Sequence, residues 1–113
     1  MVDHGDINEV RLAGRIPAAP LAREMPSGDT VWTFRLVVRR PGGRGQRAGA
    51  VDTLDCAAYT AAAVRSVRAW REGDEVEVDG VLRRRFWRSA TGARSRYEVE
   101  VGRGRKVGRP RSG

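Results

Sequence analysis

The chain has 113 residues, which is room for one domain with one modest hydrophobic core. No apolar run approaches the roughly 20 residues that span a membrane, no secretory signal begins the sequence, and the single cysteine excludes an internal disulfide. These features predict a cytoplasmic protein. The net charge of +8 and the pI near 11.2 favour a polyanionic partner, nucleic acid before an acidic membrane surface.

The two signs of charge are separated along the chain. Arginines concentrate in residues 35–47, 83–96 and 103–111, and Lys106 is the only lysine. An acidic run lies between the first two groups, at residues 72–79. A solvated mixed surface would scatter the two signs, so this separation predicts a surface dedicated to an anion.

The first half of the sequence predicts three strands. Apolar and polar residues alternate over 9–16, over 32–39 and over 53–59, which is the period of half-buried strands. "PSGD" at 26–29 is typical of a tight turn, and the glycine-rich basic segment 40–50 is typical of a flexible loop.

Residues 60–71 carry the one good helix signal. Thr60 can cap the helix, an apolar stripe at spacings of three residues ends at Trp70, and Gly73 supplies a stop. The pattern predicts that Trp70 lies in the core.

The second half predicts two more strands and a tail. Alternation resumes at residue 75 and continues to Arg88, with Gly80 as a bulge or barrel corner, and a turn leads to a strand at 96–101. Residues 103–113 show no apolar period, so we expect a folded domain over 1–102 and a short, basic, disordered tail.

The order of elements predicts an all-β class with one small helix. Three strands, a helix and a two-strand hairpin match a five-stranded OB-fold Greek-key barrel, with the helix between the third and fourth strands. SH3-like barrels and other small β folds remain alternatives on this evidence.

Six segments resemble one protein family in order and spacing. They are "NEVRLAGRI" at 8–16, "PSG" at 26–28, "FRLVVRR" at 34–40, "DTLDCAAY" at 52–59, "REGDEVEVDGVLRRRFW" at 71–87 and "RYEVEV" at 96–101. Over roughly residues 8–102 the sequence is similar to the bacterial single-stranded DNA-binding proteins. The resemblance implies an OB-fold that assembles into dimers or tetramers and wraps single-stranded DNA.

Single-strand binding needs cations for phosphates and flat rings for bases. A hairpin beyond Gly80 would expose both faces, with Arg83, Arg85 and Trp87 on one face and Arg84 and Phe86 on the other. Strand phase and the resemblance together nominate a nucleic-acid site of Arg35, Arg39, Tyr59, Arg83, Arg85, Phe86, Trp87 and Arg96.

The roles of Phe86 and Asp55 need separate comment. For Phe86 a structural role or a subunit contact stays open beside strand binding. Asp55 is unusual on a surface that binds a polyanion, and we expect it to pair with an arginine of a neighbouring strand.

The predicted function is sequence-tolerant binding of single-stranded DNA in replication, repair or recombination. An RNA-binding OB module and a replication-associated protein-interaction module are the alternatives. An enzyme is not expected, because His4 is the only histidine, Cys56 has no histidine partner, and the carboxylates lack metal-ligand spacing. We therefore predict no catalytic residues, no metal and no cofactor.

The sequence departs from the family pattern in three places. Thr53 falls where many members carry an aromatic residue, and the loop 40–50 has no tryptophan, so binding should depend more on charge. The sequence ends in "RKVGRPRSG", whereas the family has a long linker and an acidic tip that recruits other enzymes. We expect a short, nucleoid-associated paralogue without tip-dependent recruitment, forming a homotetramer or a dimer. The sequence does not decide whether DNA or RNA is preferred. It also does not decide whether the protein is the main single-strand binding protein of its cell or an accessory paralogue.

Overall fold

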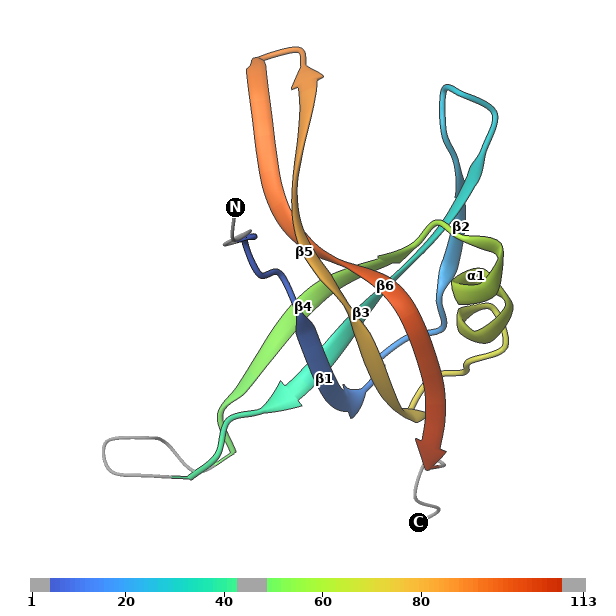
Figure 1. Ribbon diagram of the computed structural model, residues 1–113, viewed down its shortest axis with the longest axis vertical. Helices are drawn as coiled ribbons and strands as arrows, with labels where there is room; N and C mark the ends of the chain where they lie inside the picture. The colour runs from blue at the N-terminus through green and yellow to red at the C-terminus, as the bar shows by residue number, and fades with distance from the viewer. Residues whose placement is uncertain (1–4, 43–48, 109–113) are drawn as a thin grey trace.

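The computed structural model describes residues 5–42 and 49–108. The described residues form six strands and one short helix, which confirms the predicted all-β class with one small helix (Figure 1). The elements in chain order are β1 (Val10–Arg15), β2 (Leu21–Glu24), β3 (Thr30–Arg39), β4 (Val51–Ala58), α1 (Ala61–Val67), β5 (Glu75–Ser89) and β6 (Gly92–Gly108).

The strands form one curved sheet in the order β1-β5-β6-β4-β3-β2. A further pairing of β1 with β3, at Arg15 and Val37, closes the sheet into a ring. The β4–β6 pairing is parallel, at Cys56 and Val99, and the other pairings are antiparallel. The helix α1 lies between β4 and β5 in the chain, as predicted, and packs against β6. This connectivity is that of the OB-fold.

The count of five strands was wrong by one, because β2 was missed. This strand pairs with β3 across the predicted turn, in which Met25 N–H donates to the Asp29 carbonyl at 2.7 Å. All four residues of β2 are exposed. Apolar alternation reports burial of one face, so a strand held by backbone pairing alone gives no such signal.

The predicted boundary at residue 102 is also corrected. Residues 103–108 are not disordered: they complete β6 and pair with β5, from Arg103 opposite Asp79 to Gly108 opposite Glu75. Glycines interrupt the apolar pattern there, and the strand is held by its backbone pairing with β5. Arg105 lies 3.4 Å from Glu77. Glu77 belongs to the acidic run 72–79, which is distant from Arg105 in the sequence. The remainder of the predicted tail, 109–113, lies outside the described residues.

Trp70 lies in the core, as its helical phase predicts. Its ring meets Phe34 edge-on, with centroids 5.4 Å apart, and α1 presents Ala63 and Val67 to the same core. Gly104 of β6 gives the indole its space, because a Cβ at that position would lie 2.7 Å from Cη2 of Trp70. The end of β6 therefore forms part of the core.

Gly104→Ala should lower the free energy of unfolding by about 1–3 kcal/mol, because the added methyl group overpacks the indole. Gly102→Ala is the matched control in the same strand, since its Cβ would meet nothing closer than the Asp79 carbonyl at 3.5 Å. That variant should change stability by less than about 0.5 kcal/mol. Urea unfolding measures both, and equal losses would contradict this packing.

Candidate nucleic-acid interface

Two hairpins project from the same side of the ring (Figure 1). One is the β2–β3 hairpin, and the other is the outer part of β5–β6, residues 81–100, which we call the arm. The β1 pairing with β5 ends at Gly80, while β5–β6 pairing continues to Ser89 opposite Gly92. The arm therefore extends beyond the ring, as the sequence predicted.

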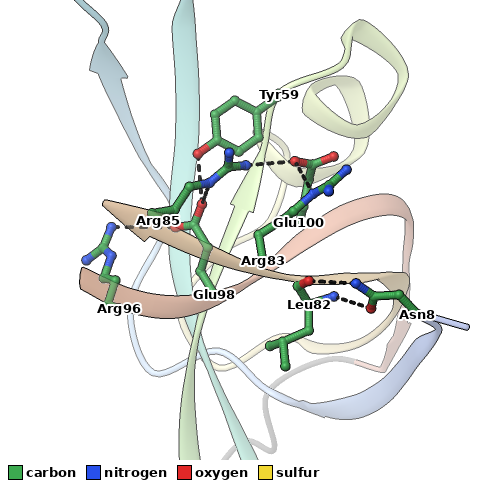
Figure 2. Close-up of polar contacts among 8 residues, drawn as sticks. All are labelled: Asn8, Tyr59, Leu82, Arg83, Arg85, Arg96, Glu98 and Glu100. Atoms are coloured by element: carbon green, nitrogen blue, oxygen red, sulfur yellow. Dashed lines mark hydrogen bonds and ion pairs between the residues drawn. The ribbon is translucent and has the colours of Figure 1, made fainter. Parts of the chain in front are cut away.

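Gly80 forms the corner at the base of the arm. The β5–β6 register shifts between Asp79 and Gly80, and a Cβ on Gly80 would lie 2.0 Å from the Glu100 carbonyl oxygen. The amide of Asn8, which precedes β1, occupies the edge of β5 just beyond the β1–β5 pairing. It donates to the Leu82 carbonyl and accepts from the Leu82 N–H, both at 2.8 Å (Figure 2). These contacts fix the direction in which the arm leaves the ring.

A groove of about 480 Å³ separates the two hairpins. We call it the hairpin groove. Arg23 and Met25 line it from the β2–β3 side, while Arg85, Trp87 and Arg96 line it from the arm. Tyr59, which follows β4, forms part of the groove lining, and Phe86 borders it. Five of the eight nominated residues therefore meet here.

Glu98 organises this groove. Its side chain sits in β6 at 3% exposure, where it accepts hydrogen bonds from Tyr59 Oη at 2.8 Å and from Arg85 Nε at 2.7 Å. Arg96 lies 3.6 Å away on the other carboxylate oxygen (Figure 2). A buried carboxylate is stable only when it is paired in this way.

Arg85 is held on both sides rather than free to bind a ligand. Its second nitrogen donates to Glu100 at 2.7 Å, and Glu100 also lies 3.5 Å from Arg83. The Arg85 guanidinium stands 4.6 Å from the centroid of the Tyr59 ring. Burial, followed by the hydrogen bond to Glu98, raises the pKa of Tyr59. Arg85 therefore orients a ring as much as it supplies charge.

Trp87 is an exposed ring of the groove that lies beside a cation. It is 46% exposed although it is a tryptophan, and its only cation contact among the described residues is Arg96, 5.9 Å from the ring centroid. A large exposed ring beside a guanidinium is available to stack with a flat partner.

The remaining nominated residues lie apart. Arg35 of β3 is exposed and lies 3.5 Å from Asp55, which confirms the expected ion pair of Asp55 with a neighbouring strand. Arg35 and Arg96 line an adjacent hollow of about 360 Å³, so the surface continues from the arm onto the ring. Arg39 is elsewhere: it lines a separate hollow with Arg15, at the other end of β3.

Sequence reasoning missed the two carboxylates. Glu98 and Glu100 stand in the alternating run "RYEVEV", which predicts only that they share the phase opposite Val99 and Val101. Their partner Arg85 is nominated on the same face, and cross-strand pairing of opposite charges was the available signal.

Other site chemistries find little support in the described part of the chain. No helix within residues 5–42 and 49–108 is long and apolar enough to cross a membrane, and no group of three potential metal ligands gathers there. Burial raises the pKa of the Cys56 thiol to about 12, so the thiol stays protonated at neutral pH.

The strand connectivity defines an OB-fold, with a groove of rings and arginines on one side. The chain belongs to the single-strand binding protein family, whose model matches residues 7–105. The computed structure is similar to a solved structure described as a Plasmodium falciparum SSB complex with ssDNA, with a TM-score of 0.73. That match covers 95% of this chain and 98% of the other, and at 22% identity it shows the fold alone.

Two bacterial relatives are similar in sequence. One is single-stranded DNA-binding protein 3 of Listeria innocua serovar 6a, 32% identical over 95 residues. The other is the single-stranded DNA-binding protein of Oceanobacillus iheyensis, 30% identical over 95 residues. Each match covers 84% of this chain but only 59% and 58% of the relative. The chain thus spans less than two thirds of the length of either.

Proposed function

We propose that this protein binds single-stranded DNA with little sequence preference and protects it during replication, repair or recombination. The observation that carries the proposal is the hairpin groove, where Trp87 and Tyr59 lie among arginines on the open side of the fold. Family membership and the names of the two bacterial relatives support the same ligand.

Different residues of this surface bind the bases and the phosphates. Bases stack on Trp87 and Tyr59, and stacking tolerates any sequence because every base has a π-face. Phosphates contact the exposed arginines Arg35 and Arg96. Glu98 is buried beneath them, so its carboxylate positions Tyr59 and Arg85 without meeting the phosphates.

Affinity for oligo-dT should fall linearly on a plot of log K against log salt concentration, by about 0.7 per phosphate neutralised. The double variant Arg35→Gln and Arg96→Gln should lose two phosphate contacts, which makes the slope shallower by about 1.4. Fluorescence anisotropy at several salt concentrations measures this slope.

The matched control removes two other exposed arginines, Arg68 and Arg71, which lie after α1 and line none of the hollows described above. Their replacement by glutamine should leave the slope nearly unchanged. An affinity independent of salt, or an equal change in both double variants, would show that the groove arginines do not bind phosphate.

The alternative ligand is single-stranded RNA, which the same rings and cations would accept. Competition between DNA and RNA oligonucleotides of equal length decides between them, with DNA expected to win. The homo-oligomer, the cytoplasmic location and the absence of enzymatic activity are further parts of the proposal. Light scattering of the free protein tests the first of these.

A further inference from the structure

The arm has a second face, of which only Phe86 also lines the groove. Cross-strand pairs place Arg84 opposite Tyr97 and Phe86 opposite Ser95, on the phase that alternates with Arg85 and Trp87. We call the surface of Arg84, Phe86, Arg88, Ser95 and Tyr97 the reverse face. Phe86 is 71% exposed and Tyr97 is 59% exposed, so neither ring serves the core.

Arg84 joins these two rings into one surface. Its guanidinium carbon lies 5.1 Å from the centroid of Phe86 and 5.3 Å from that of Tyr97. Ser95 Oγ accepts from Arg84 Nε at 3.3 Å and from its Nη2 at 3.1 Å. The cation is thereby held between two rings that stay open to solvent.

The charge of the reverse face is uncompensated, in contrast to that of the groove. In the groove, Glu98 and Glu100 pair with the arginines. On the reverse face the cross-strand partners are alanine, serine and tyrosine, and no ion pair of Arg84 or Arg88 occurs within residues 5–42 and 49–108. Exposed rings with unpaired cations suit a ligand that has flat faces and negative charge.

The two surfaces of the arm meet at Phe86. This residue borders the hairpin groove, and its ring contacts Arg84 of the reverse face. A strand that leaves the groove past Trp87 therefore reaches the reverse face without crossing an acidic side chain of the arm.

We propose that the reverse face is a second stacking site, at which Tyr97 and Phe86 take bases of the same single strand and Arg84 takes a phosphate. This inference rests on the proposed function and extends it, since a strand bound in the groove continues over the edge of the arm. An oligonucleotide long enough to occupy both faces then binds more tightly than one that fills the groove alone.

The test compares oligo-dT of about 6 and about 20 nucleotides, lengths within and beyond the span of one OB-fold. The double variant Arg84→Gln and Tyr97→Ala should bind the long oligonucleotide about tenfold more weakly, the loss expected for one stacked base. Its affinity for the short one should stay within about twofold of wild type. Tyr97→Phe keeps the ring and should bind both lengths like wild type.

The outcomes separate this inference from the proposed function. Loss of long-strand affinity alone supports the second site. A double variant that binds both lengths like wild type overturns the second site and leaves the groove intact, while wild-type protein that binds neither length overturns both. A fall in the mass measured by light scattering for the double variant would instead make the reverse face a contact between copies, which also overturns the inference.

Discussion

Replacing Trp70 by alanine should lower the free energy of unfolding by about 3–5 kcal/mol, the range for removing a buried aromatic ring. The indole is buried between Phe34, the helix α1 and the end of β6. Its removal leaves a cavity at the point where the last strand closes on the helix, and the backbone at Gly104 cannot fill it because glycine has no side chain.

Trp87→Ala is the matched control for this experiment, because it removes the same side chain from the half-exposed arm. It should change the free energy of unfolding by less than about 1 kcal/mol, as for other surface substitutions. Urea unfolding followed by circular dichroism compares the two variants. Equal stability losses would contradict the assignment of Trp70 to the core and Trp87 to the surface.

The same Trp87→Ala variant should weaken oligo-dT binding by about 1–3 kcal/mol, the usual value of one base stacked on an aromatic ring. The expected loss is about 5-fold to 150-fold in affinity, since each 1.4 kcal/mol is a factor of ten. The ring faces the hairpin groove beside Arg96, so its removal takes away the stacking surface while Glu98 still holds Tyr59 and Arg85.

Fluorescence anisotropy with labelled oligo-dT measures this loss. Tyr97→Phe serves as a control because it keeps an aromatic ring on the opposite face of the arm. If Trp87→Ala binds oligo-dT as tightly as wild type, the strand does not use this groove.

The strands were predicted from apolar alternation, which requires one buried face. Strands without a buried face were therefore missed or cut short. Strands with one buried face, such as β1 and β3, alternate clearly and were found from the sequence. The exposed strand β2 is held by backbone pairing, and the end of β6 by backbone pairing and ion pairs, so neither leaves an apolar period. Lys106, for example, pairs with Asp74 at 3.2 Å, a contact between segments that only the fold brings together.

For the candidate site, the sequence predicted which residues share a strand face. It did not predict which residues from different elements lie next to one another. Phase along β5 places Arg85 with Trp87 and Arg84 with Phe86. In the structure Arg84 lies over the Phe86 ring, while Phe86 also lines the groove with Arg85 and Trp87. Phase gives the face of a strand but not the neighbours of each position, so Arg39 was predicted to join Arg35, although the two line separate hollows. The role of Glu98 depends on three neighbours from different elements, which no local pattern reveals.

Intrinsic fluorescence tests the central claim most directly. Of the three tryptophans, Trp32 and Trp70 pack into or against the core, and Trp87 faces the groove. Oligo-dT should quench the emission of the wild-type protein. Trp87→Phe keeps a stacking ring, so it should still bind oligo-dT by anisotropy while most of the quench disappears. An undiminished quench in that variant would show that single-stranded DNA binds at another ring and would contradict the assignment of the groove.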